Sequence, residues 1–62
     1  MKDITERELQ VMREIGKGYT YRETGQVLHI SQETVRAHLQ NIYRKLSVDN
    51  RVEALNKLKD VL

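Results

Sequence analysis

The chain has 62 residues, a mass of 7.3 kDa and no cysteine, which excludes a second domain, a disulfide and a thiolate metal site, and favours a reducing compartment. It has no apolar run of about 18 residues to span a membrane and little room for a deep cleft, so we expect neither a membrane protein nor an enzyme. Eleven basic and nine acidic residues give a net charge of +2. The basic excess lies in residues 34–62, which is compatible with a polyanionic partner without requiring one.

The first predicted helix covers residues 6–16. Thr5 and Glu8 have the spacing of a capping box, in which each side chain bonds the backbone N–H of the other residue. Gly16 and Gly18 follow, and either can take the left-handed conformation that ends a helix. The residues expected on its buried face are Leu9, Met12 and Ile15.

A second, short helix is predicted over residues 20–28. Thr20 and Glu23 repeat the capping-box spacing. Its inward face is expected to carry Tyr21, Thr24, Gly25 and Leu28. A glycine inside a helix costs about 1 kcal/mol relative to alanine, and it permits another helix to approach closely.

Two further helices are predicted over residues 31–46 and 50–61, with Ser31 and Asn50 at their starts. The third helix has a continuous apolar stripe of Val35, Leu39, Ile42 and Leu46. The fourth carries Val52, Leu55, Leu58 and Leu62. No alternating pattern predicts a strand. The chain is therefore predicted to be an all-α four-helix bundle, and a short helix, a tight turn and a longer helix are typical of a helix-turn-helix.

The third helix should expose a polar face suited to the DNA major groove. Away from its apolar stripe lie Glu33, Arg36, Ala37, Gln40, Asn41 and Arg44. Arginine can bond guanine with two hydrogen bonds, glutamine can bond adenine, and alanine can contact the methyl group of thymine. Threonine, histidine and lysine at the edges of this face suit phosphate oxygens. Taken alone, the same face could also be an ordinary solvated surface.

The order of these motifs resembles the LuxR-type helix-turn-helix family. The resemblance covers residues 4 to about 55, with ITERE at 4–8, GYTYRE at 18–23, ISQETVRAHL at 30–39, NIYRKL at 41–46 and NRVEA at 50–54. It implies a cytoplasmic, bacterial domain that binds double-stranded DNA sequence-specifically in transcription regulation, with its helix-turn-helix at 20–39. It further implies a homodimer through the fourth helix and RNA polymerase as a possible partner. It implies no cofactor, metal or small-molecule ligand.

The resemblance also assigns roles by position. The base-contacting positions are Arg36, Ala37 and Gln40. The phosphate-contacting positions are Thr20, Arg22, Thr34, His38 and Lys45. The expected dimer surface is Val52, Leu55, Leu58 and Leu62. The residues expected to tie helices together are Arg7, Glu8, Arg51 and Glu53.

Two features depart from the family pattern. Thr24 and Gly25 stand where the family commonly has isoleucine and alanine, which predicts a looser second helix. Gln40 stands where some members have lysine, which favours adenine over guanine or phosphate. Residues 1–62 are expected to form a single domain, either excised from a larger regulator or free-standing.

Parts of this sequence also fit functions other than DNA binding. The apolar stripe of the fourth helix could serve a protein-interaction module that never meets DNA. Region 4 of a sigma factor shares the helix-turn-helix, but residues 45–51 and the fourth helix argue against it. His29 and His38 lack the neighbours of a metal site, and no serine or histidine has a relay partner for catalysis.

Overall fold

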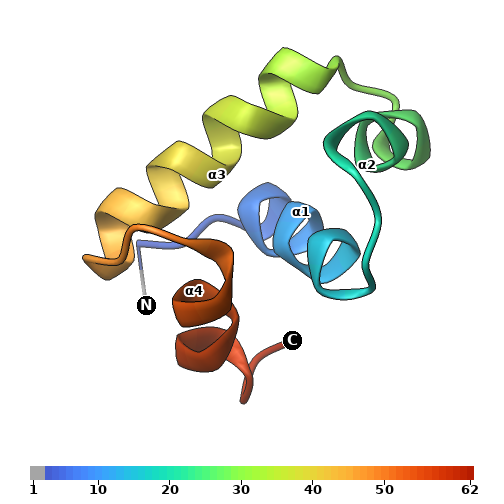
Figure 1. The fold of residues 1–62 in the computed structure, drawn as a ribbon. Helices are drawn as coiled ribbons and strands as arrows, with labels where there is room; N and C mark the ends of the chain where they lie inside the picture. Colours follow the sequence, from blue (N-terminus) through green and yellow to red (C-terminus); the bar gives the residue numbers. More distant parts are fainter. Residues whose placement is uncertain (1–2) are drawn as a thin grey trace.

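The computed structural model describes residues 3–62 as four helices without a strand in that range (Figure 1). They are α1 (Glu6–Gly16), α2 (Tyr21–Leu28), α3 (Gln32–Leu46) and α4 (Arg51–Leu58). The all-α prediction is thus confirmed; the first two residues of the expected domain 1–62 lie outside the described residues. No helix in the described range has the length and hydropathy needed to cross a membrane.

The helix starts follow the predicted caps. The Thr5 Oγ1 accepts a hydrogen bond from the Glu8 backbone N at 3.1 Å, and the Glu8 carboxylate accepts one from the Thr5 N at 2.9 Å. Thr20 and Glu23 make the same pair of bonds at 3.1 and 2.8 Å. Each box satisfies two N–H groups that a helix start otherwise leaves without partners, and the side chains of Ser31 and Asn50 cap α3 and α4.

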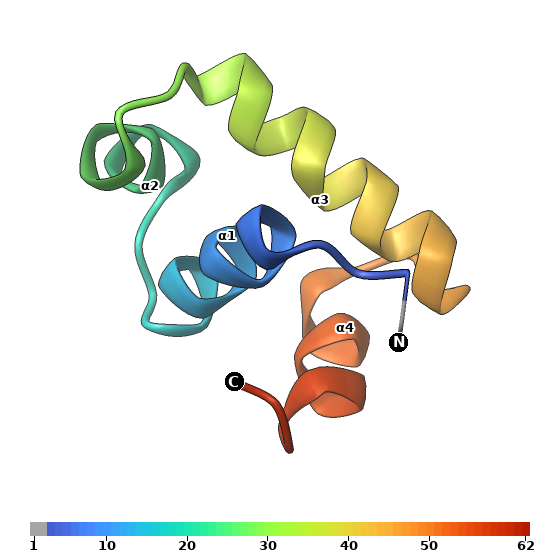
Figure 2. The same cartoon turned by 180° about the vertical axis from the view of Figure 1, so that it is seen from behind.

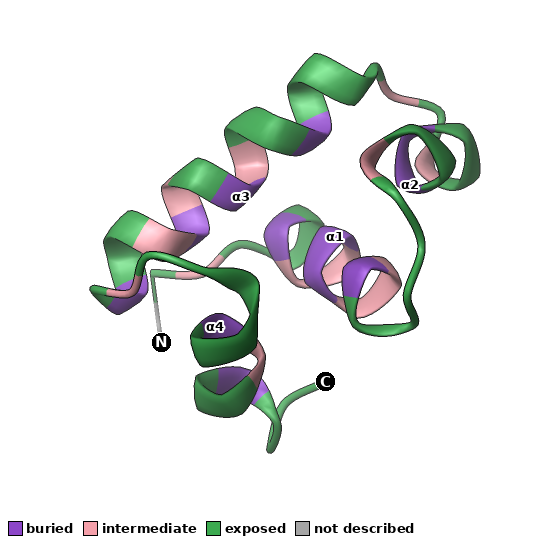
Figure 3. Ribbon diagram, in the orientation of Figure 1, coloured by how far each residue is buried: buried purple, intermediate pink, exposed green. Residues whose placement is uncertain are grey.

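The long helix α3 is the element on which the others pack. It contacts α1, α2 and α4, with α2 near its N-terminal end and α4 near its C-terminal end (Figures 1 and 2). Its predicted apolar stripe is confirmed, since Val35, Leu39, Ile42 and Leu46 are all buried (Figure 3). Helix α1 supplies the facing side of the core with Val11, Met12 and Ile15. Leu9, expected there, is only half-buried, and the sequence reasoning missed Val11.

Helix α4 is shorter than predicted: it ends at Leu58, whereas the sequence predicted an end at residue 61. Ala54 and Leu58 are buried, whereas residues 59–62 are exposed and form a turn. Short helices depend on tertiary packing for most of their stability, and beyond Leu58 there is no buried side chain to provide it. The helix is anchored to the end of α3 by Lys57, whose Nζ donates to the Leu46 carbonyl oxygen at 2.9 Å.

The turn between α2 and α3 is tight because of Gly25. A Cβ at this position would lie 2.6 Å from the carbonyl oxygen of Ile30, while the Ile30 N–H donates to the Gly25 carbonyl at 2.9 Å. The chain reverses through His29, which adopts a left-handed φ of 61°. The expectation of a looser second helix stays a prediction, while at Gly25 the absent side chain lets the backbones touch. The neighbouring Thr24 is fully buried, and its hydroxyl has no hydrogen-bond partner among residues 3–62.

We predict that Gly25→Ala lowers the free energy of unfolding by about 2 kcal/mol, although alanine is the better helix former. The added methyl group would meet backbone that cannot move without breaking the turn. Urea unfolding followed by circular dichroism measures the effect. Gly16→Ala is the matched control, because its Cβ would lie 3.1 Å from the flexible end of Leu55. Equal losses for both variants would contradict the steric explanation.

Candidate nucleic-acid interface

The outer surface of α3 is a second stripe, opposite the buried one. Glu33, Ala37, Gln40 and Arg44 recur at the same spacing as the core residues but are displaced by two positions, which turns them to the other side of the helix. All four are exposed, and we call them the outer stripe. Arg36 is exposed beside it. The predicted base-contacting residues Arg36, Ala37 and Gln40 therefore share one accessible surface (Figure 3).

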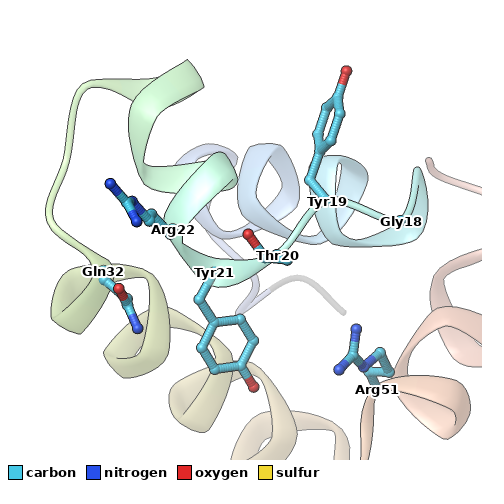
Figure 4. A pocket seen from close by; sticks show the side chains of 7 residues that line it. All are labelled: Gly18, Tyr19, Thr20, Tyr21, Arg22, Gln32 and Arg51. Carbon is cyan, nitrogen blue, oxygen red and sulfur yellow. The ribbon is translucent and has the colours of Figure 1, made fainter.

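One flank of the outer stripe meets the start of α2. A hollow of about 370 Å³ lies there, lined by Gly18, Tyr19, Thr20, Tyr21, Arg22, Gln32 and Arg51 (Figure 4). Gln32 is the first residue of α3, on the same side of that helix as Arg36. The structure thus brings together Thr20 and Arg22, which the sequence reasoning had placed at phosphates.

The N-terminus of α2 can bind an anion at this hollow. Thr20 is exposed, and its Oγ1 only accepts in the capping box, so its O–H proton is available for donation. The capping box satisfies the N–H groups of Thr20 and Glu23, so those of Tyr21 and Arg22 are the ones left without a partner within the helix, and they carry partial positive charge. Together with the exposed Arg22 guanidinium, these groups suit a phosphate oxygen.

The opposite flank of α3 carries Thr34 and His38. Thr34 is exposed, and its Oγ1 lies 2.8 Å from the Ser31 hydroxyl, so the two share a hydrogen bond at the helix start. His38 is half-buried one turn further along. The polar groups predicted for phosphates therefore border both sides of the outer stripe, as the two backbones border a DNA groove.

Arg51, which was expected to tie helices together, also borders the hollow. It is exposed and lies across the hollow from Arg22 (Figure 4). Burial, and then Tyr21, raise the pKa of the Tyr43 phenol above 10.0, and the positive charge of Arg51 partly opposes that rise. No local sequence signal could have placed Arg51 here, because α2 and α4 border the same hollow only as a result of the packing of each helix against α3.

The contacts of Lys45 differ from its predicted role at a phosphate. The Lys45 Nζ donates to both Glu8 carboxylate oxygens at 2.9 and 3.0 Å and to the Asp3 carbonyl at 2.8 Å. Glu8 is buried, and burial alone would raise its pKa. The hydrogen bonds from Lys45 and Thr5 and the charge of Lys45 outweigh this and lower the pKa below 4.5. Lys45 therefore joins α3 to α1. Glu8, which was expected to tie helices together, does so through this ion pair.

The four residues expected at a dimer surface do not lie on one surface. Leu58 is fully buried in the core of its own chain, so its assignment to a dimer surface is wrong. Leu55 is half-buried beside Gly16 of α1. Val52 is 65% exposed and Leu62 37% exposed. Of these four residues, Leu58 belongs to the core and Leu55 packs against it, whereas Val52 and Leu62 face solvent, Leu62 beyond the end of α4.

No group of three or more His, Asp and Glu side chains within residues 3–62 is arranged to hold a metal ion.

Comparison with known proteins decides the family of this helix-turn-helix. The family described as "Bacterial regulatory proteins, luxR family" matches residues 2–58. The chain belongs to this family. The luxR-family match extends from before α1 to the end of α4, so it includes the helix-turn-helix and both helices that flank it. Membership in a family of regulatory proteins supports the expectation that this domain is not an enzyme.

Several curated relatives are response regulators. The nitrate/nitrite response regulator protein NarP of Escherichia coli is 45% identical over 51 residues, which are 82% of this chain and 24% of NarP. The transcriptional regulatory protein LnrK of Bacillus subtilis is 42% identical over 52 residues, 84% of this chain and 24% of LnrK. The response regulator protein VraR of Staphylococcus aureus is 40% identical over 52 residues, 84% of this chain and 25% of VraR. The luxR-family chain thus spans about a quarter of these relatives, and no solved structure matches it significantly.

We predict that Lys45→Met lowers the free energy of unfolding by about 2 kcal/mol at pH 7, because it leaves the buried Glu8 carboxylate without its cation. The pKa of Glu8 is lowered in the folded domain, so the ion pair stabilises above pH 4.5 and its contribution is lost as the pH falls through the folded pKa. Urea unfolding at pH 7 and pH 3 should therefore show a smaller loss at pH 3.

The control for this prediction is Lys17→Met, which removes an exposed partner of Glu14 at 3.3 Å and should change stability little at either pH. An equal loss at pH 7 and pH 3 for Lys45→Met would mean that packing of the lysine stem, and not its charge, is what stabilises the domain.

Proposed function

We propose that this luxR-family domain binds double-stranded DNA sequence-specifically in the cytoplasm to regulate transcription, with the outer stripe of α3 in the major groove. The observation that carries the proposal is the arrangement around α3. Its outer stripe is exposed along the helix, and groups suited to phosphate oxygens lie on both of its flanks. The family of regulatory proteins and the response-regulator relatives support it.

Three residues of α3 are proposed to read bases. The Arg36 guanidinium can donate two hydrogen bonds to guanine, and the Gln40 amide can pair with adenine. Ala37 lies between them and is small enough to let the helix approach the groove, where its methyl group can contact thymine. All three are exposed, so binding would require no rearrangement of the core.

The proposed phosphate contacts are Thr20 and Arg22 on one flank and Thr34 and His38 on the other. The exposed Arg51 beside the α2 hollow is added to the first group, and Lys45 is removed because Glu8 and Asp3 engage it. A net charge of +2 and so few contacts predict weak binding by one copy. Useful affinity would then come from two linked copies.

A homodimer through α4 is proposed on the exposed part of that helix. Val52 projects away from the buried Ala54, and Leu62 and the half-buried Leu55 are the other apolar candidates. Two copies related by a two-fold axis would read two half-sites about one helical turn apart. RNA polymerase is a further partner in this proposal. The alternative of a protein-interaction module would use the same apolar residues as the proposed dimer, without Leu58, which is buried.

Selection from a random duplex pool, followed by titration of the selected DNA at two salt concentrations, tests DNA reading. We predict that Arg36→Ala costs about 1–3 kcal/mol on the selected sequence and relaxes one base position. Arg7→Ala, the loss of an exposed arginine of α1, is the matched control and should leave the selected motif unchanged. Equal losses for Arg36→Ala on selected and random DNA would rule out base reading by this residue.

Val52→Gln tests the proposed dimer without changing charge. We predict about tenfold weaker binding to DNA with two half-sites and unchanged binding to a single half-site, because only the contact between copies is altered. Val27→Gln, which changes an exposed valine of α2, is the control. Fluorescence anisotropy with both duplexes measures the difference, and an unchanged two-site affinity would place the dimer contact elsewhere.

A further inference from the structure

Glu33 is the single acidic residue of the outer stripe, between the N-terminus of α3 and Ala37. It is exposed, and no hydrogen bond or ion pair found within residues 3–62 involves its carboxylate. A negative charge on a surface that faces DNA is repelled by phosphates, so its presence there calls for a physical reason.

Helix capping does not supply that reason. In α1 and α2, the glutamate at the third helical position, Glu8 or Glu23, bonds back to the backbone N–H of the cap residue. In α4, Glu53 bonds the side chain of the cap residue Asn50 at 3.1 Å. In α3 the third position belongs to Thr34, whose hydroxyl contacts Ser31. Glu33 stands one position earlier, in the first turn, where the helix dipole favours its negative charge but no capping hydrogen bond holds its carboxylate.

We propose that Glu33 is a specificity-determining residue whose carboxylate accepts a hydrogen bond from the N4 amino group of a cytosine in the major groove. This inference rests on the proposed function, since it needs α3 in that groove. Among the base edges of the major groove, amino donors occur only on cytosine and adenine, and carboxylates pair with the cytosine N4 group.

The position of that cytosine follows from the helix geometry. Glu33 and Arg36 are three residues apart, which is about 4.5 Å along the axis at about 1.5 Å per residue. Base pairs are stacked about 3.4 Å apart. The cytosine therefore lies on the base pair next to the one that Arg36 reads, toward the N-terminal end of α3.

The carboxylate raises specificity at the expense of affinity. Its repulsion from phosphates weakens binding to every sequence, and only a site with an amino donor at the matching position restores the loss. Removing the carboxylate, as in Glu33→Ala, should therefore have two effects. Binding to random DNA becomes tighter, and discrimination at one base pair disappears.

The test compares the native domain with Glu33→Ala, which removes both the charge and the acceptor oxygens, and with the control Glu6→Ala, which removes an exposed first-turn glutamate of α1. Each protein selects sequences from the same random duplex pool. The native motif is then titrated with its cytosine intact and with the cytosine replaced by 2-pyrimidinone, which lacks the N4 amino group. Circular dichroism verifies that all three proteins are folded.

We expect the native domain and Glu6→Ala to lose about tenfold in affinity on the 2-pyrimidinone duplex, whereas Glu33→Ala binds both duplexes equally and binds random DNA more tightly. Three results would overturn the inference while leaving the proposed function intact: a native motif without that cytosine, an unchanged motif for Glu33→Ala, or equal losses for all three proteins on 2-pyrimidinone. If the folded native domain selects no sequence at all, the proposed function fails, and this inference fails with it.

Discussion

Burial of one face of α3 is the constraint on which the rest of this domain depends. Val35, Leu39, Ile42 and Leu46 contribute to the core that α1, α2 and α4 complete, and a fully buried side chain of this kind stabilises by about 1.5–3 kcal/mol. A domain of 62 residues has no second core to compensate for their loss. Because these four side chains must face inward, the rotation of α3 about its axis is set, and the outer stripe is held toward solvent as a rigid surface.

The C-terminal end of α3 is secured by two lysines rather than by apolar contacts alone. Lys45 bonds Glu8 of α1, and Lys57 of α4 bonds the carbonyl of Leu46 at the end of α3. Both charges are thereby committed to the fold, although both belong to the basic half of the sequence. The cations left around the outer stripe and its hollow are arginines, namely Arg22, Arg36, Arg44 and Arg51. Arginine suits this surface, since its planar guanidinium bonds phosphates and guanine with two hydrogen bonds.

The turn of the helix-turn-helix shows how a residue that weakens a helix can strengthen a fold. Gly25 lowers the intrinsic stability of α2, but it permits a backbone contact with Ile30 that a methyl group would block. This contact brings α3 against α2 and places Thr20 and Arg22 beside Gln32 at one hollow. The buried Thr24 hydroxyl, which has no hydrogen-bond partner among residues 3–62, lowers the stability of the fold, and the packing of α2 against α3 must offset this loss.

The amino-acid sequence was sufficient to predict the four helix starts and the apolar stripe of α3, and hence the exposed surface that carries Arg36, Ala37 and Gln40. These features depend on residues three or four positions apart, as in the pair Thr20 and Glu23, and such spacings are visible in the sequence. The roles of Lys45, Leu58 and Arg51 depend on contacts between helices, which the spacing of residues along the chain does not reveal. Lys45 and Glu8 are separated by 37 residues, and Leu58 is buried rather than exposed because of how α4 packs. Periodicity predicts that a helix has an apolar face, but not whether its own chain or a partner will cover that face, since this depends on contacts between distant segments.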